Sequence, residues 1–245
     1  MSGLVLDGVV FHHDRTPFRF DLDVRRGEWM ALIGPSGAGK STLLDLAAGF
    51  IPPAAGRIVM EGRDVTDLGP AERPLSMVFQ DDNLFPHLTA EENVAIGIAP
   101  RFRLGRRARE RARQALDEVG IGALAGRRPA AMSGGERQRV GLARAFLRER
   151  PVLLLDEPFA ALGPALRREM LELLRAARAR RSDPPTVLMV THHPEDARGF
   201  CDRVAFLEDG SVRAVGETEA MLGGSAPEAV RRYLGALPQG AKPAP

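Results

Sequence analysis

The chain has 245 residues, 44% of them hydrophobic and 27% charged, a balance typical of a globular protein and not of a disordered or fibrous one. Its 34 basic and 32 acidic residues leave a formal charge of +2, which gives no indication of a nucleic-acid partner. It has no apolar run near the roughly 18 residues of a membrane span, no basic and then apolar leader, and a single cysteine, Cys201, so we expect a cytoplasmic protein without disulfides.

The basic residues are very unevenly divided, with 32 arginines and only two lysines. Lys242 lies close to the end of the chain, so Lys40 is the only lysine in the rest of it. A compact ammonium on a flexible stem differs from the planar guanidinium of arginine. We therefore expect Lys40 to hold a position that arginine cannot fill.

A short apolar segment, Trp29–Ile33, is predicted to be a buried strand, and Leu43–Ala48, followed by Gly49, is predicted to be a helix. Between them, glycines would let backbone amides converge on phosphate oxygens, and the helix start adds its positive dipole end. The sequence therefore predicts an ATP site in which Lys40 reaches the β- and γ-phosphates and Ser41 binds Mg²⁺; the alternative is an ordinary glycine turn. The segment that contains the phosphate-binding pattern GxxxxGK(S/T) is Gly34, Pro35, Ser36, Gly37, Ala38, Gly39, Lys40, Ser41 and Thr42.

A second helix start follows at Ser133, which is predicted to cap a helix over Glu136–Arg148. Gly134 and Gly135 leave the backbone amides at this helix start uncovered, which makes a second anion site. A single nucleotide in its own phosphate loop does not require this second site. The alternative is a capped helix that binds nothing.

Two carboxylates follow the apolar segment Val152–Leu155, which is predicted to be a fully buried parallel strand. Ligands bind at the carboxyl ends of the strands in open α/β sheets, so Asp156 and Glu157 would face the phosphates. We expect Asp156 to hold Mg²⁺ through water and Glu157 to act as the general base on the attacking water. An acidic turn without a ligand is the alternative.

With these three segments the chain resembles the ATP-binding subunits of ABC transporters. Their signature, LSGGQ, reads MSGGE here, so that Met132 and Glu136 are departures from it. The resemblance extends from about Leu4 to Tyr233. It implies an α/β fold: a P-loop NTPase core with an antiparallel β subdomain and an inserted helical subdomain.

The resemblance also implies a domain organisation and a first partner. It places the ATP-binding domain at residues 1–235, with a helical subdomain at about 81–148, and a disordered tail at 236–245. In the family, two subunits stack head to tail, and the signature of each closes over the γ-phosphate held by the other. The residues that would contact the nucleotide of a second copy in this way are Ser133, Gly134, Gly135 and Glu136.

Two further catalytic residues follow from the resemblance. Gln80, after the predicted strand Leu75–Phe79, matches the glutamine that touches Mg²⁺ and the attacking water. His192, after the predicted strand Thr186–Val190, matches the histidine that senses the γ-phosphate. A lone histidine is more often structural, and its place after a strand end favours the functional role; the adjacent His193 is expected to be a surface residue.

Phe11 resembles the aromatic residue near the N-terminus that stacks on adenine in the family. That residue is usually tyrosine, and phenylalanine keeps its π-face and loses only the hydroxyl. A plain core position is the alternative for Phe11, since Phe18 and Phe20 are close in the sequence.

One departure concerns the segment after the two carboxylates. Family members usually read SALD there, whereas this chain has Ala160, Ala161, Leu162 and Gly163. The aspartate that Gly163 replaces normally helps to couple the two ATP sites across the dimer. The resemblance therefore implies hydrolysis, and it leaves the cooperation between the two sites open.

Three classes of function compete: a subunit that drives a separate membrane permease, a soluble ABC ATPase acting on DNA or ribosomes, and a regulator that hydrolyses ATP poorly. A single ATP-binding unit without a coiled-coil insertion favours the first, in a bacterial importer at the cytoplasmic face of the inner membrane. The partners would be a second copy of the chain, a membrane permease subunit and, indirectly, a periplasmic solute-binding protein. No nucleic acid is expected.

Within the family, the stretches Gly34–Phe50, Ser76–Thr89 and Asp156–Arg167 are most similar to the ATP-binding subunits of importers for thiamine or its phosphates. The ATPase does not touch the transported solute, so this substrate rests on likeness alone. Importers of iron, sulfate or polyamines are the alternative.

Two surface features complete the prediction. The arginine-rich stretch Arg101–Arg113 would meet lipid phosphates or a permease loop, or would be a solvated helix face. In the second case Leu104, Ala108, Ala112 and Leu116 would be turned inward. A groove around residues 79–93, with the apolar Leu84 and Phe85, is the expected contact with the permease.

Overall fold

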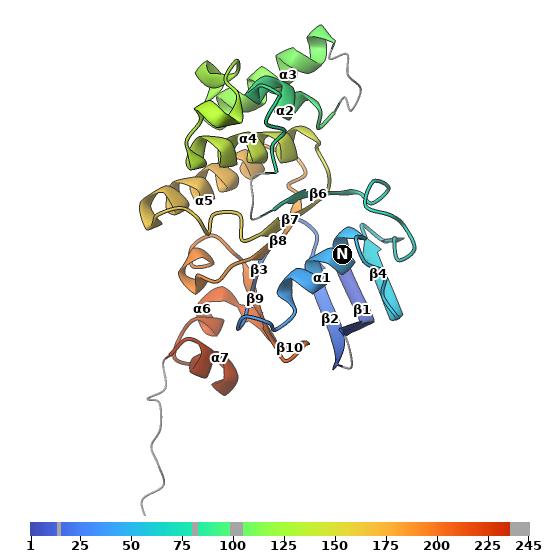
Figure 1. Ribbon diagram of the computed structural model, residues 1–245. Helices are drawn as coiled ribbons and strands as arrows, with labels where there is room; N and C mark the ends of the chain where they lie inside the picture. The colour runs from blue at the N-terminus through green and yellow to red at the C-terminus, as the bar shows by residue number, and fades with distance from the viewer. Residues whose placement is uncertain (14–15, 80–82, 99–104, 236–245) are drawn as a thin grey trace, which may run out of the picture.

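A mixed sheet of ten strands forms the centre of the computed structural model, which describes residues 1–13, 16–79, 83–98 and 105–235. The expected α/β class is confirmed (Figure 1). In spatial order the strands are β5 (Arg63–Asp64), β4 (Ala55–Met60), β1 (Ser2–His13), β2 (Thr16–Arg25), β10 (Ser211–Glu217), β9 (Arg203–Glu208), β3 (Trp29–Ile33), β8 (Thr186–Val190), β7 (Val152–Asp156) and β6 (Leu75–Val78).

The strands from β9 to β6 are parallel to one another. The predicted strands Trp29–Ile33 and Thr186–Val190 are confirmed at both ends. Strand β7 continues one residue further than predicted, through Asp156, and β6 ends at Val78, one residue before its predicted end. Because these strands run in the same direction, the loops that follow β3, β7 and β8 leave the sheet at one edge.

The remaining strands form the antiparallel part that the resemblance implies. Strand β1 pairs antiparallel with both β2 and β4, β4 pairs with β5, and β10 pairs with β9. Strand β10 joins this part to the parallel one, because it also lies beside β2, with Ser211 opposite Arg19. The two parts thus form one continuous sheet.

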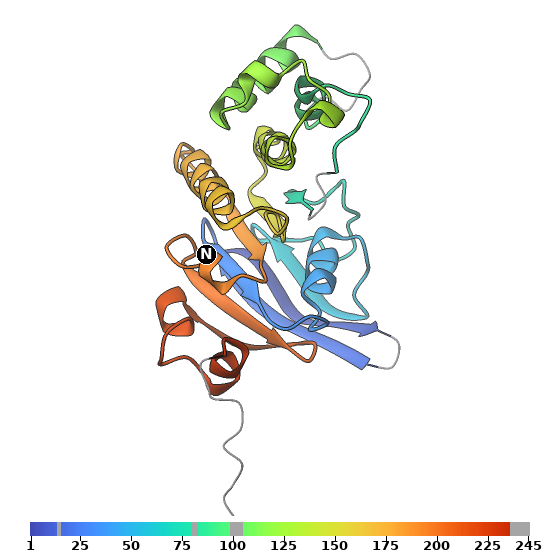
Figure 2. The same cartoon turned by 60° about the vertical axis from the view of Figure 1, so that its left-hand side comes forward.

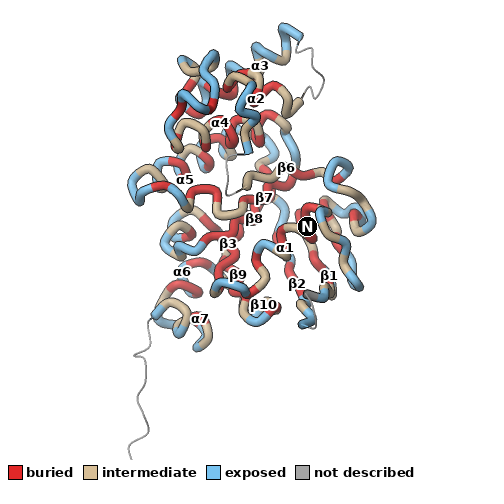
Figure 3. The backbone as a smooth tube through the Cα atoms, in the orientation of Figure 1, coloured by how far each residue is buried: buried red, intermediate tan, exposed pale blue. Residues whose placement is uncertain are grey.

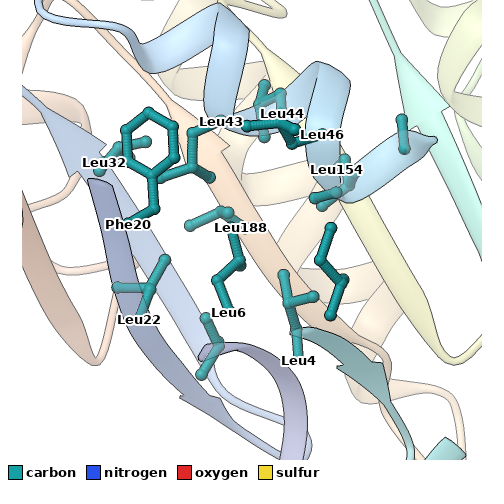
Figure 4. Close-up of a cluster of buried hydrophobic side chains, with 14 of the residues drawn as sticks. Leu4, Leu6, Phe20, Leu22, Leu32, Leu43, Leu44, Leu46, Leu154 and Leu188 are labelled. Carbon is teal, nitrogen blue, oxygen red and sulfur yellow. The ribbon is translucent and has the colours of Figure 1, made fainter. Parts of the chain in front are cut away.

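Both faces of the parallel part are covered, which explains why its strands are apolar along their whole length. Alternate side chains point to opposite faces: Met30 and Leu32 belong to one buried cluster, and Ala31 and Ile33 to the other. Helix α1 (Lys40–Ala48) and the antiparallel strands cover the first face, where the leucines of α1 belong to the same buried cluster as Leu4 and Leu6 of β1 (Figure 4). The helices on the second face include α5 (Pro164–Ala179), α6 (Thr218–Met221) and α7 (Glu228–Tyr233).

Three helices lie together beyond the sheet, at the top of Figure 1, and enclose a hydrophobic cluster of their own (Figures 2 and 3). Helix α4 belongs to two clusters, because Val140 and Ala143 face the other two helices while Leu142 and Phe146 face the sheet. The three helices of this group are α2 (Ala90–Ala95), α3 (Arg106–Glu118) and α4 (Gly134–Leu147). Short 3₁₀ turns lie at η1 (Gly122–Leu124), η2 (Pro129–Ala131) and η3 (Pro194–Asp196).

The described part of the arginine-rich stretch is a helix face that pairs with its neighbours. Ala112 and Leu116 of α3 are buried, as predicted. Arg109 and Arg113 both pair with Glu91, a nearly buried carboxylate in the first turn of α2. These contacts favour the solvated-face interpretation. Within the described ranges, no helix combines the length and the apolar character that crossing a bilayer would require.

Candidate functional site

The phosphate-loop segment leaves β3 and enters α1 at Lys40, three residues before the predicted helix start. Gly39 stands at the N-cap with φ 103° and supplies no side-chain cap, which leaves the first amides of the helix available to a ligand. Gly34 is required by space, because a Cβ atom there would lie 2.0 Å from the carbonyl oxygen of Leu207. The loop thus forms the cradle that the pattern predicts.

Lys40 is held at the mouth of this cradle. Its ammonium donates hydrogen bonds to the carbonyl oxygens of Gly34 at 2.8 Å and Pro35 at 2.9 Å. Burial lowers the pKa of Lys40, and the nearby carboxylates of Glu157 and Asp156 partly oppose that shift. The side chain is only 5% exposed, so its charge is directed into the site and not into bulk solvent.

A buried arginine holds the other end of the same helix, and the motif gives no sign of it. Arg73 is 1% exposed and donates to the carbonyl oxygens of Leu46 at 2.7 Å and Ala47 at 2.8 Å. Gly49 leaves room for it, since a Cβ atom there would lie 2.5 Å from the guanidinium. The cation supplies further donors to carbonyls at the C-terminal end of α1, one of which also accepts from the amide of Gly49, and it complements the negative end of the helix dipole.

The two carboxylates lie at the carboxyl end of β7. Burial, followed by the charges of Glu157 and Asp45, raises the pKa of Asp156 to about 6, and the charge of Lys40 opposes this shift. Glu157 has φ 45°, and its amide donates to the carbonyl oxygen of Val190 at 3.1 Å, which fixes its backbone against the end of β8. A desolvated carboxylate beside two others suits a divalent cation, which would stabilise its charged form. With the Ser41 hydroxyl, the oxygen donor set fits Mg²⁺.

His192 lies directly against the second carboxylate. Its Nε2 atom is 2.6 Å from Oε1 of Glu157. His193 is exposed, as is His192 itself. The side chains of Glu157 and His192 come from loops after different strands, β7 and β8, which pair in parallel. The structure therefore brings the predicted general base and the predicted γ-phosphate sensor into contact.

A cavity of about 300 Å³ joins these groups. It accommodates a polyphosphate chain and places both catalytic candidates at its wall. Phe18 lines it, whereas Phe11, which lies opposite Phe18 on the neighbouring strand, is not among the lining residues. Both residues pack against the same core cluster. Sequence reasoning missed Phe18, although its ring also fills the space beside Gly39. The lining residues are Phe18, Ser36, Gly37, Gly39, Lys40, Ser41, Thr42, Glu157 and His192.

The signature segment begins α4, and the predicted cap at Ser133 is confirmed. The Ser133 hydroxyl accepts from the amide of Glu136, and the Glu136 carboxylate accepts from the amide of Ser133 at 2.7 Å. These hydrogen bonds lower the pKa of Glu136. Within the described ranges, the amides of Gly134 and Gly135 have no partner, and neither residue lines the cavity of its own chain. The start of α4 therefore does not contribute to the phosphate cavity of its own chain.

Gln80, one of the residues of the predicted site, lies outside the described residues. Gly163 is the N-cap of α5, with φ −65° and no side-chain cap. A Cβ atom there would meet nothing within 4 Å, so the position is open and has space for the carboxylate that the family usually carries.

Comparisons with known proteins agree with this geometry. Residues 18–160 match the family described as ABC transporter. The chain is 50% identical over 232 residues to the thiamine import ATP-binding protein ThiQ of Brucella suis, covering 95% of each protein. It is 51% identical over 231 residues to the protein of the same name from Mesorhizobium japonicum, covering 94% of this chain and 90% of that protein.

Two solved structures have similar folds. One is the ATP-binding cassette MJ0796 as a post-hydrolysis dimer bound to ADP and Pi, with a TM-score of 0.75 and 31% identity over 88% of this chain and 98% of that one. The other is the ADP conformation of the cassette MJ1267, with a TM-score of 0.83 over 96% and 99% of the two chains. At 24% identity, the second supports the fold alone.

Proposed function

This chain belongs to the ABC transporter family, and we propose that it is the subunit whose ATP hydrolysis drives the import of thiamine through a separate membrane permease. The contact between Glu157 and His192 at the wall of the phosphate cavity carries the ATPase part of the proposal. The thiamine part rests on the importer ATPases that share about half of this chain's residues over nearly its whole length.

The phosphate loop binds the substrate ATP. Backbone amides at the start of α1 and the ammonium of Lys40 meet the phosphate oxygens, where they neutralise charge in a site with little water. Ser41 and Asp156, together with Gln80, would hold Mg²⁺, which supplies further neutralisation of the transferring phosphoryl group. The aromatic contact with adenine is assigned to Phe11, whose strand lies next to that of Phe18.

Hydrolysis requires a proton acceptor for the attacking water. Glu157 is placed for this, because its carboxylate lines the cavity while its backbone is fixed against β8. His192 orients that carboxylate through the contact at 2.6 Å and can reach a γ-phosphate in the same cavity. Positioning and charge neutralisation account for most of the catalysis of phosphoryl transfer, and these residues provide both.

A second copy of the chain completes the site. The amides of Gly134 and Gly135 have no partner among the described residues, and neither residue lines the cavity of its own subunit, which leaves them available to the nucleotide of a second copy. Closure on ATP and reopening after hydrolysis would switch the permease between its two orientations. The subunit would lie peripherally on the cytoplasmic face of the inner membrane, with the periplasmic solute-binding protein on the far side.

A cavity of about 1010 Å³ lies between the β6 edge of the sheet and the three-helix group, where the permease contact is expected. Phe85 lines it and is 46% exposed, and its loop is fixed by Asn93, whose side chain accepts from the Phe85 amide and donates to its carbonyl. Arg144, Arg148 and Arg150 form a basic wall. An apolar permease segment that ends in an acidic group would match this lining.

Leu84→Asp and Phe85→Asp should prevent the permease from binding. Phe85→Asp puts a charge into the lining of the cavity, where an apolar segment would have to dock, whereas Leu84 does not line the cavity and packs against the cluster of the three helices beside it. We expect co-purification of the permease and thiamine uptake to fall by at least about tenfold, while ATP binding by the isolated subunit stays unchanged. Phe50→Asp, at an exposed phenylalanine that does not line this cavity, is the control. Unaltered assembly and transport would remove this surface from the proposal.

The substrate is tested with the ATPase, its permease and the thiamine-binding protein reconstituted in liposomes. We expect thiamine to stimulate ATP hydrolysis several-fold, and sulfate, iron or polyamines to have no effect. Hydrolysis that is indifferent to thiamine would leave the ATPase in place and exclude thiamine as the solute.

A further inference from the structure

Arg167, in the first turn of α5, connects two loops of the catalytic centre. Its side chain is 11% exposed, and one guanidinium nitrogen donates to the carbonyl oxygen of Leu162 at 3.0 Å. A second nitrogen lies 3.7 Å from a carboxylate oxygen of Asp196, whose side chain is 15% exposed. One cation therefore bridges the segment that follows Glu157 and the segment that follows His192.

Asp196 extends this connection to the backbone around His192. Its carboxylate accepts from the hydroxyl of Thr191 at 3.2 Å, and the same hydroxyl accepts from the amide of His193 at 3.0 Å. Thr191 is buried, and its amide donates to the carbonyl oxygen of Leu32 in β3. The residues on both sides of His192 are thus held by one threonine, and Asp196 fixes that threonine.

The contacts close into a circuit. His192 meets Glu157 at 2.6 Å. From Glu157, two turn hydrogen bonds lead along the chain to Leu162, from the amide of Ala160 to Glu157 and from the amide of Leu162 to Phe159. The carbonyl oxygen of Leu162 accepts from Arg167, and Arg167 pairs with Asp196. Asp196 closes the circuit through Thr191, which holds the backbone on both sides of His192. The amide of Arg167 also donates to the carbonyl oxygen of Gly163 at 3.0 Å, so a displacement of the exposed Gly163 segment would move Arg167 and with it this circuit.

The charge of Arg167 stabilises the ionised carboxylate of Asp196. Burial raises the pKa of Asp196, and Arg167 is the strongest of the groups that oppose the shift. Removing one member of a buried ion pair leaves the charge of the other uncompensated. Without Arg167, either the loop after β8 rearranges or Asp196 takes up a proton. Either response would move Thr191 and with it His192.

We infer that Arg167 is a positioning residue for hydrolysis, which aligns His192 with Glu157 and transmits displacements of the Gly163 segment to that pair. The inference rests on the proposed ATPase function. Gly163 supplies no carboxylate of its own, so in this chain the ion pair behind it provides the connection between the subunit surface and the catalytic histidine.

The test measures kcat and KM for ATP in the reconstituted importer. Because misplacement of a catalytic group by about 1 Å can cost up to about 100-fold, we expect Arg167→Met to lower kcat about tenfold, with KM within about twofold. Arg167→Lys should restore part of kcat, because it keeps the charge that faces Asp196. The matched control is Arg168→Met, the next residue on the helix, whose side chain is 73% exposed; kcat should not change.

A double-mutant cycle with Asp196→Asn separates positioning from a general loss of structure. Both single variants should lower kcat, and the double variant should lower it no further, because all three break the same connection. The inference would be overturned if the double variant lost kcat by the product of the two single losses, or if KM rose without a change in kcat. If Arg167→Met fails to fold, Arg167→Lys and Asp196→Asn carry the same test. Failure of the proposed ATPase function would show in the wild type instead, as an absence of ATP hydrolysis with and without thiamine.

Discussion

Glu157→Gln is expected to lower kcat for ATP hydrolysis by about 10²- to 10⁴-fold, the range that a general base contributes. The amide has nearly the shape of the carboxylate and cannot accept the proton of the attacking water. It can still contact His192, which lies 2.6 Å away in the native structure, so the geometry of the cavity should persist. ATP affinity should change by no more than about twofold, because Lys40 and the loop amides supply the phosphate contacts.

Two measurements check this result. Single-turnover hydrolysis reports the chemical step, and size-exclusion chromatography with ATP reports the dimer, which the variant should retain in its closed form because the bound ATP is not cleaved. Glu172→Gln, at a half-exposed carboxylate on α5, is the matched control and should hydrolyse ATP at the native rate. Native turnover in Glu157→Gln would show that another group accepts the proton.

Lys40→Arg is expected to weaken MgATP binding by about 10- to 100-fold, although it conserves the charge. The ammonium fits between two carbonyl oxygens 2.8 and 2.9 Å away, in a position that is 5% exposed. The planar guanidinium is larger and cannot make these hydrogen bonds and reach the phosphates from the same place. Hydrogen bonds to charged groups contribute about 1.5 to 3 kcal/mol each, which corresponds to the expected loss.

Equilibrium binding of a fluorescent ATP analogue measures the affinity directly. Lys242→Arg changes the other lysine of the chain, which lies outside the described residues, and should bind the analogue as the native protein does. Native affinity in Lys40→Arg would mean that the scarcity of lysine carries no information about this position.

Local patterns predicted the parts of the site that a short segment determines by itself. The strand Trp29–Ile33 and the cap at Ser133 are confirmed, because an apolar run between turn residues and a serine before two glycines act within a few residues. The α/β fold also follows from these segments and the family resemblance, and the solved structures agree with it.

Contacts between distant segments could not be predicted in this way. Arg73 satisfies carbonyls about 26 residues earlier in the chain, and nothing in its own neighbourhood indicates a buried cation. The approach of Phe18 to the cavity depends on how β2 lies above the phosphate loop. Likewise, the ion pair of Arg167 with Asp196 exists only because α5 and the loop after β8 meet on one face of the sheet. Such contacts are set by packing, and packing is a property of the whole fold.

The scarcity of lysine also makes the nucleotide site chemically addressable. Reagents that acylate uncharged amines have three targets in this chain, the amino terminus, Lys40 and Lys242. Burial lowers the pKa of Lys40, which increases the fraction that such reagents can attack, and the side chain lines the cavity that ATP would fill. The acylated fraction of Lys40, measured by mass spectrometry, should therefore follow the fraction of subunits whose site holds no nucleotide during turnover. A protein rich in lysine would offer no comparably simple label.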